Sequence, residues 1–170
     1  MLAAFSRHDA ALAWARARAA AEFGSIALES PPFTFDQTDY YRESMGEGLR
    51  KVFFAFEKPY SLDDTVETKL ATNGWEAQYA AEAHHAEPRP LNLDPGYLTL
   101  GKLVLSSTKD FAHRIYLARG IYAEVTLFFR HGRWEHHEFT FADYCRADYQ
   151  AFFTRCRDWL HRRRREGAAL

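Results

Sequence analysis

The stretch NLDPGYLTLGKLVLSSTKDFAHRIYLARGIYAEVTLFFR, residues 92–130, decides the fold. It joins a Pro-Gly pair, an apolar run and a strongly alternating segment. Charged and other polar side chains recur inside it at intervals, namely Asp94, Lys102, Lys109, His113, Arg114 and Glu124. The stretch therefore holds both the expected sheet and most of the plausible chemistry, although it does not reveal a reaction.

Its second half is typical of a β-hairpin, because apolar residues alternate with polar or aromatic ones. The two halves flank Ala-Arg-Gly at 118–120, where glycine can take the positive φ that a short hairpin loop needs. The apolar residues stay on one face when Leu117 lies opposite Ile121. That register places Arg114 directly opposite Glu124.

The Arg114–Glu124 pair has two interpretations. On the surface of a sheet it would be an ordinary ion pair, contributing less than about 1 kcal/mol. In a covered pocket, Arg114 would bind an anion and Glu124 would orient it. The sequence alone leaves both open.

The front of the stretch predicts a turn followed by a helix. Asp94-Pro95-Gly96 has the residues of a tight turn, with proline fixing φ and glycine free to take a positive φ. The apolar residues after it fit one helical face, and Gly101 interrupts a strand pattern. We therefore expect a short buried helix from about Thr99 to Ser107.

Length and composition indicate one globular domain over residues 1–170. The chain is 47% hydrophobic and 16% aromatic, which excludes a disordered class. A formal net charge of -1 gives no global attraction to nucleic acid or anionic membrane. A basic tail begins at about residue 161 and contains Arg162–Arg165, which we interpret as a solvated helix end.

The cysteines and the apolar runs bear on localisation. Cys145 and Cys156 are the two cysteines, and they have neither disulfide-framework nor zinc-site spacing. No secretory segment precedes the domain, and no run reaches the roughly 20 apolar residues that span a bilayer. We therefore expect a cytoplasmic protein without membrane contact.

The elements predict an α+β fold with a mostly antiparallel sheet. Strands and helices alternate up to about residue 82, so the front half is expected to be ferredoxin-like. The hairpin and a third strand, Trp134 to Phe141, form a three-stranded meander that can turn either His136 or His137 inward. A C-terminal helix then closes the fold.

The candidate site residues gather around this stretch. A phosphorylated or otherwise anionic small ligand, or a nucleotide, is expected in a pocket near residues 92–124. The ligand-binding candidates are Lys102, Lys109, Arg114, Tyr97, Asp39 and Tyr40, and the acid–base candidates are Asp94, His113 and Glu124. The tyrosines could equally be half-buried packing, and the KDFAHR charges could pair locally.

A non-enzymatic module that binds RNA or protein is the alternative. The sheet would then carry Tyr116, Tyr122 and Phe128 as stacking residues beside Arg114 and Arg130. No metal site is assigned, because His84 and His85 have no partner that the sequence reveals. The sequence indicates neither a cofactor nor an oligomeric state.

Three strings resemble one family. They are FTFDQTDYYRESMGEGL, NLDPGYLTLGKLVLSSTKDFAHRIYL and GIYAEVTLFFRHGRWE, and they resemble the bacterial family called domain of unknown function 4416. The resemblance runs from about Leu2 to the last helix. It implies no activity and no catalytic residues. Family members are sometimes labelled nucleotide-binding, but this chain has no GxxxxGK[ST] loop.

Overall fold

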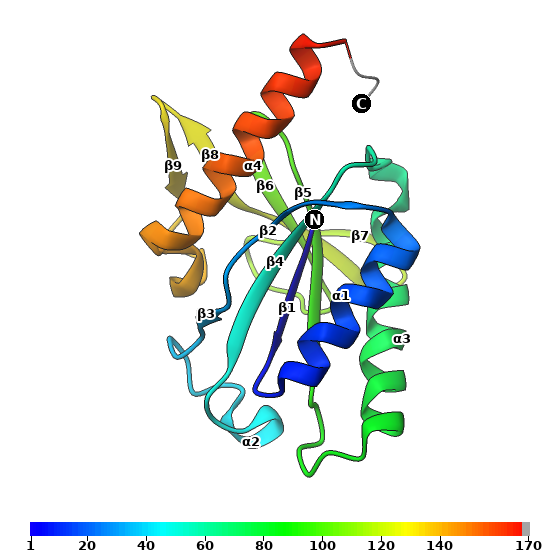
Figure 1. The fold of residues 1–170 in the computed structure, drawn as a ribbon. Coiled ribbons are helices and arrows are strands. Elements are labelled where there is room, and N and C mark those ends of the chain that lie inside the picture. Colours follow the sequence, from blue (N-terminus) through cyan, green and yellow to red (C-terminus); the bar gives the residue numbers. More distant parts are fainter. Residues whose placement is uncertain (168–170) are drawn as a thin grey trace. The chain divides into compact units, whose positions relative to one another are not determined.

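Figure 1 shows the order of elements along residues 1–167, the part of the chain that the computed structural model describes. The helices are α1 (Asp9–Phe23), α2 (Arg42–Met45), α3 (Thr65–Ala83) and α4 (Ala147–Arg165), and the 3-10 turns are η1 (Leu62–Asp64) and η2 (Ala142–Cys145). The strands are β1 (Leu2–Ser6), β2 (Ile26–Glu29), β3 (Phe33–Thr34), β4 (Arg50–Phe56), β5 (Asn92–Leu98), β6 (Lys102–Ser107), β7 (Ile115–Ala118), β8 (Ile121–Arg130) and β9 (Arg133–His136). The strand pairings are antiparallel. The predicted α+β class with a mostly antiparallel sheet and a C-terminal helix is confirmed.

Contacts divide the chain into two compact units. Unit 1 contains Met1–Lys58 and Glu67–Pro95, and unit 2 contains Pro59–Val66 and the chain from Gly96 onward. Two of the boundaries fall inside α3 and β5 and not in a linker. The single domain expected from the sequence therefore stays a prediction.

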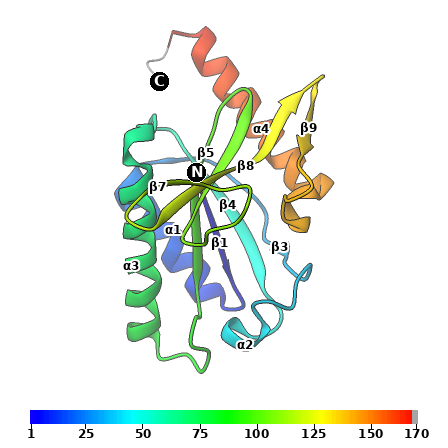
Figure 2. The ribbon, with the colours of Figure 1, turned by 180° about the vertical axis from the view of Figure 1, so that it is seen from behind.

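In unit 1 the strand order is β2-β4-β1-β5, with β3 added beside β4. Helices α1 and α3 lie side by side in both views (Figures 1 and 2). They cover one face of these strands. Side chains two residues apart point to that same face, as Leu2 and Ala4 of β1 do. The core of this layer contains Leu2, Ala4, Ala11, Leu12, Ala15, Ala19, Val52, Phe54, Trp75, Tyr79, Leu91 and Leu93.

A second, smaller cluster of unit 1 starts from the opposite face of β1. Phe5, one residue after Ala4, packs with Phe35, Met45 and Leu49. Phe35 directly follows β3, Met45 ends α2 and Leu49 directly precedes β4, so this cluster fixes the segment between β3 and β4.

In unit 2 the long strand β8 is the centre. Strand β6 pairs along one edge of β8, and β7 pairs along the other, since Ala123 faces both Ser106 and Ile115. Strand β9 pairs with the last part of β8, on the same edge as β7. Trp134 of β9 and Phe153 of α4 contact edge to face at 6.4 Å, which packs the helix on this meander.

The predicted tight turn at Asp94-Pro95-Gly96 is wrong, because these residues lie inside β5. Strand β5 changes partner here: Pro95 pairs with Leu2 of β1, whereas Gly96 pairs with Leu105 of β6. The glycine is required by space. A Cβ on it would lie 2.2 Å from the carbonyl oxygen of Val104.

The predicted helix from Thr99 to Ser107 is also wrong. The segment makes a turn, in which the Thr99 N–H donates to the Lys102 carbonyl at 2.8 Å, and then forms β6. Consecutive residues Leu103, Val104 and Leu105 are all buried, so both faces of β6 are covered. A strand buried on both faces has no alternation, and its apolar run resembles that of a buried helix.

The third strand of the meander is shorter than the predicted Trp134 to Phe141. Strand β9 ends at His136, and His136 and His137 are both exposed. Neither histidine therefore takes the inward position that the sequence left open for one of them.

Candidate functional site

The candidate site of unit 2 forms where the chain crosses β8. Strands β6 and β7 lie on opposite edges of β8, so the connection between them, residues 108–114, must pass over one of its faces. Glu124 lies near the start of β8 and is buried. His113 and Arg114, at the end of the connection, both contact its carboxylate.

The Glu124 carboxylate accepts three hydrogen bonds. Arg114 Nε donates to Oε2 at 2.7 Å, His113 Nε2 donates to the same oxygen at 3.0 Å, and the Thr126 hydroxyl donates to Oε1 at 3.1 Å. Both Arg114 and Glu124 have side chains that are only 3% exposed. A buried charge is tolerated when it is paired and hydrogen-bonded in this way.

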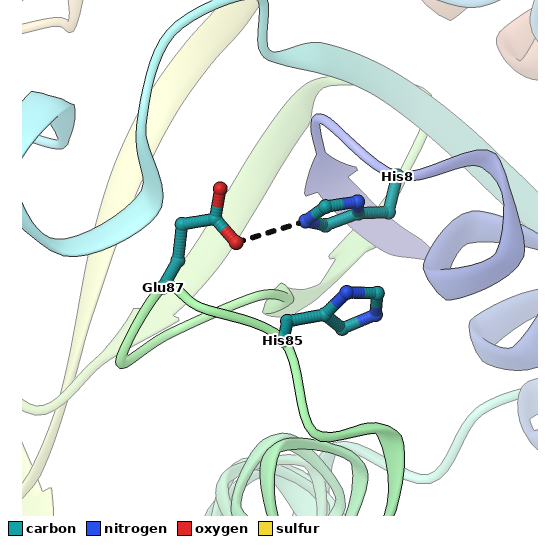
Figure 3. Close-up of side chains that lie close together, drawn as sticks. All are labelled: His8, His85 and Glu87. Atoms are coloured by element: carbon teal, nitrogen blue, oxygen red, sulfur yellow. Dashed lines mark hydrogen bonds and ion pairs between the residues drawn. The ribbon is translucent and has the colours of Figure 1, made fainter.

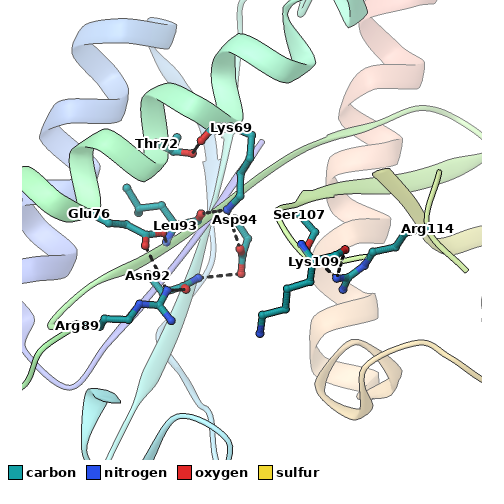
Figure 4. Close-up of polar contacts among 10 residues, drawn as sticks. All are labelled: Lys69, Thr72, Glu76, Arg89, Asn92, Leu93, Asp94, Ser107, Lys109 and Arg114. Carbon is teal, nitrogen blue, oxygen red and sulfur yellow. Dashed lines mark hydrogen bonds and ion pairs between the residues drawn. The ribbon is translucent and has the colours of Figure 1, made fainter. Parts of the chain in front are cut away.

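Arg114, the last residue of the crossing connection, also bonds to the start of that connection. Its Nη1 donates to the Ser107 hydroxyl at 2.8 Å and to the Lys109 carbonyl at 3.0 Å, as Figure 4 shows. Its Nη2 makes no hydrogen bond to the part of the chain that the structure describes. We call Ser107, His113, Arg114, Glu124 and Thr126 the Glu124 site.

The Arg114–Glu124 pair predicted from the hairpin is confirmed, and it lies on a covered face of the hairpin. The pairing of Ile115 with Ala123 fits the predicted register, which shifts only beside the loop, where Ala118 and not Leu117 pairs with Ile121. Ile115, Leu117 and Val125 are exposed, whereas Arg114, Glu124 and Thr126 are buried. The crossing connection covers the face that carries Glu124, so the pair takes the covered position, one of the two that the sequence left open.

Exposed aromatic rings surround the site. The His113 ring is parallel to that of Phe139 at a centroid distance of 5.2 Å and to that of Phe111 at 6.1 Å. The Arg114 guanidinium lies 4.7 Å from the Phe111 ring and 5.6 Å from the Phe141 ring. All three phenylalanines are exposed, and a group of exposed large apolar side chains is typical of an interaction site.

The contact with Glu124 determines which ring nitrogen of His113 carries a hydrogen. A carboxylate only accepts hydrogen bonds, so Nε2 of His113 carries a hydrogen, and Nδ1 takes no part in this contact. No described residue bonds Nδ1. An imidazole held by a carboxylate in this way is oriented for proton transfer or for binding.

Asp94, a predicted acid–base candidate, belongs to a separate network in unit 1 (Figure 4). Lys69 Nζ donates to the Leu93 carbonyl at 2.8 Å and lies 3.3 Å from Asp94 Oδ1. The Asn92 amide donates to Asp94 Oδ2 at 3.0 Å. These bonds tie α3 to β5, and every polar atom named here is used within the network.

Glu76 extends this network along α3. Its carboxylate accepts the Leu93 N–H at 2.7 Å and lies 3.3 Å from Arg89 Nη2. Burial raises the pKa of Glu76, although the nearby Lys69 charge and the Leu93 hydrogen bond act in the opposite direction. The network is thus a partly desolvated set of charges that joins two elements of unit 1.

The remaining predicted residues do not contact Glu124. Tyr97 pairs with Val104 in the β5–β6 ladder, and Lys102 is an exposed residue at the start of β6. In unit 1, Asp39 Oδ1 pairs with Arg42 at 3.1 Å, and Tyr40 is exposed and meets Tyr41 edge to face. Of the nine candidates, the structure joins His113, Arg114 and Glu124, together with the backbone of Lys109.

The sequence analysis did not identify several residues that belong to the Glu124 site or lie beside it. They are Ser107, Thr126, Phe111, Phe139 and Phe141. One signal was present: Glu124 and Thr126 lie two residues apart in an apolar strand, so they share a face. Nothing in the sequence places Phe139 against His113, because that contact depends on the path of the chain after β9.

Comparison with known proteins gives a family and no activity. The model of the domain of unknown function family DUF4416 matches residues 1–159, so this chain belongs to that family. No curated protein and no solved structure matches the chain. Among the described helices, none has the length and apolar character needed to cross a bilayer.

Proposed function

We propose that the Glu124 site binds a small anionic ligand that carries a planar ring, of the nucleotide class. The observation that carries this proposal is the pair of nitrogens, Arg114 Nη2 and His113 Nδ1, that bond no described residue while exposed phenylalanines flank both side chains. Such a site offers polar groups for an anion and rings for stacking.

The aromatic rings support the ring-binding part of the proposal. Phe111, His113 and Phe139 are mutually parallel within a few degrees, with interplanar angles of 8° and 1°. Exposed rings that are held parallel can stack a base or another flat group, at about 1–3 kcal/mol per base. The same rings also limit the access of water to the buried ion pair.

The charges support an anion of low charge. Glu124 offsets Arg114, so an unprotonated His113 leaves the trio neutral and a protonated one leaves a single positive charge. A monophosphate or a carboxylate suits this balance better than a triphosphate. An anion would receive a hydrogen bond from Arg114 Nη2 and, where protonated, from His113 Nδ1.

Calorimetric titration of the full chain tests the proposal. Adenosine 5′-monophosphate is compared with adenosine, which lacks the anion, and with ribose 5-phosphate, which lacks the ring. We expect the nucleotide to bind at least tenfold more tightly than either half. Equal affinity for all three compounds, or no binding of the nucleotide, contradicts the proposal.

Two exposed aromatic residues of unit 2 serve as a matched pair of variants. Phe139→Ala should weaken nucleotide binding about tenfold, because it removes the stacking partner of His113. Tyr116→Ala should leave it unchanged, since Tyr116 contacts Tyr122 and not the site. If short RNA binds instead, and Tyr116→Ala abolishes that binding, the RNA-binding alternative holds and the pocket proposal is wrong.

We also infer a ferredoxin-like arrangement for unit 1 and a cytoplasmic location. The β2-β4-β1-β5 order, with α1 after β1 and α3 after β4, supports the first. The free thiols of Cys145 and Cys156 support a reducing compartment.

A further inference from the structure

Two histidines and a glutamate of unit 1 come together from distant parts of the chain (Figure 3). His8 lies between β1 and α1, whereas His85 and Glu87 lie in the connection from α3 to β5. One donor atom of each residue lies within 4.8 Å of the donor atoms of the other two, and all three side chains are half-buried. We call His8, His85 and Glu87 the histidine cluster.

We propose that the histidine cluster binds a divalent transition-metal ion, with Zn²⁺ as the best match. Two imidazole nitrogens and one carboxylate oxygen are the donors that zinc and its neighbours prefer. Three protein ligands leave a further coordination position open to water or to a substrate.

Two members of the histidine cluster, His85 and Glu87, are also bonded by residues outside it, and each keeps one further atom that can bind a metal. The Tyr79 hydroxyl bonds Nε2 of His85 at 3.1 Å, which leaves Nδ1 of that ring for the metal. Arg7 donates to Oε1 of Glu87 at 2.9 Å, which leaves Oε2. Metal ligands are commonly oriented by such second hydrogen bonds, which fix the ring and its tautomer.

The backbone that carries the cluster is fixed as well. Ser6 is fully buried, and its hydroxyl accepts the His8 N–H at 3.0 Å and donates to the Pro90 carbonyl at 2.5 Å. This residue therefore ties the start of α1 to the segment that carries Glu87. Pro88 and Pro90 restrict the same segment.

Without a metal the same groups can satisfy one another. His8 Nε2 lies 3.1 Å from Glu87 Oε2, and the rings of His8 and His85 stack at 3.8 Å. A metal ion would replace the hydrogen shared by His8 and Glu87, and the stacked rings must turn so that one nitrogen of each ring reaches it. The positive charge of Arg7 beside Glu87 opposes a second cation, so we expect moderate affinity and not that of a closed structural zinc site.

This proposal departs from the expectation that the chain has no metal site. The sequence did not reveal this set, because His8 precedes Glu87 by 79 residues and only the fold brings it beside His85 and Glu87. The cluster also has a matched internal control. His84 is exposed, adjoins His85 and has a φ of 51°, which asparagine tolerates, so His84→Asn keeps the backbone and tests binding by any loop histidine.

Calorimetry with ZnCl₂ and absorption spectroscopy with CoCl₂ test the proposal on the full chain after treatment with a chelator. We expect one ion per chain, visible Co²⁺ absorption bands and a rise of several degrees in Tm at saturating Zn²⁺. His85→Asn and Glu87→Gln should each weaken binding at least tenfold. Tyr79→Phe should also weaken it about tenfold by releasing the His85 ring, and His84→Asn should bind like the unchanged protein.

Melting of each metal-free variant shows whether it folds. Loss of binding in a variant that melts like the unchanged chain supports the proposal. The proposal is overturned if the unchanged chain binds no ion stoichiometrically. It is also overturned if His84→Asn loses as much affinity as His85→Asn, since binding would then come from exposed histidines in general.

Discussion

Arg114 donates a hydrogen bond from Nε to Oε2 of Glu124 over 2.7 Å, and each of the two side chains is 3% exposed. The pair joins the end of a crossing connection to the strand beneath it. Its burial makes it different from an ion pair on a sheet surface, where water screens both charges. We therefore expect the ion pair to contribute to the stability of unit 2 as well as to its candidate site.

Arg114→Ala should lower the free energy of unfolding by about 3–5 kcal/mol, because it leaves the Glu124 carboxylate buried without its cation. Replacing both residues, as Arg114→Met with Glu124→Leu, should cost less than the single change, since no charge is then left uncompensated. Urea denaturation followed by circular dichroism measures both differences.

Arg130→Ala is the control for that measurement. Arg130 also pairs with a glutamate, Glu135, at 2.8 Å, but its side chain is 61% exposed. Its removal should cost less than about 1 kcal/mol. Similar unfolding midpoints for Arg114→Ala and Arg130→Ala would show that the buried pair contributes no more than a surface pair.

Gly96→Ala should destabilise unit 2, because the added Cβ would lie 2.2 Å from the Val104 carbonyl oxygen and 2.9 Å from Leu105 Cδ2. Relief of the clash requires β5 and β6 to separate, and overpacking of this kind costs about 1–3 kcal/mol or more. Gly101→Ala is the control, since nothing lies within 4 Å of its added Cβ. Thermal melting that lowers Tm equally for both variants would contradict the close-approach explanation.

Cys156 should resist thiol reagents in the folded protein. Burial raises the pKa of its thiol from 9.0 to about 12, so almost no thiolate is present at pH 8. Cys145 is only half-buried, and it should react first. Labelling with a chromogenic disulfide reagent, with and without urea, measures the two rates, and rapid labelling of both thiols without urea would disagree with the buried position of Cys156.

The same pKa shift predicts how stability depends on pH. Above about pH 9 the unfolded chain releases the Cys156 proton while the folded chain keeps it. The folded state then binds more protons, so the free energy of unfolding falls as pH rises from about 9 towards about 12. Cys156→Ala should show a shallower fall than the unchanged chain in urea denaturation at pH 8, 9 and 10.

Lys69→Met should destabilise unit 1 by about 1–3 kcal/mol, because the Leu93 carbonyl and Asp94 lose their donor inside a buried network. The deficit should grow as pH rises from 5 to 7. Without the Lys69 charge the pKa of Glu76 rises further, so the folded state holds a proton that the unfolded state has released. Lys58→Met, at an exposed position, should change neither value, and a deficit that is constant with pH would exclude this coupling.

The alternating pattern of residues 114–130 was sufficient to predict the hairpin and the Arg114–Glu124 pair, whereas beside the loop Ala118 and not the predicted Leu117 pairs with Ile121. Local spacing determines these features, since residues that face each other across a short loop are set by counting from the loop. The predicted C-terminal helix rests on local spacing as well: Tyr149, Phe152, Phe153 and Cys156 recur at helical intervals, and all four are buried on α4.

Local spacing failed where distant segments cover an element. The run Leu103–Leu105 is a strand covered on both faces, and Gly96 is set by the backbone that approaches it from β6. In neither place does the spacing of apolar residues predict the conformation, because the residues that decide it lie on other parts of the chain.

The sequence by itself therefore determined the α+β class, the pairing of Ile115 with Ala123 in the hairpin and the family to which the chain belongs. Only the tertiary structure decided that Arg114 and Glu124 face inward, since that depends on the path of residues 108–114 over β8. The histidine cluster likewise depends on the return of the chain from α3 to the end of β1. Alternation fixes which side chains share a face, whereas burial and long-range proximity follow from what the rest of the chain places against that face.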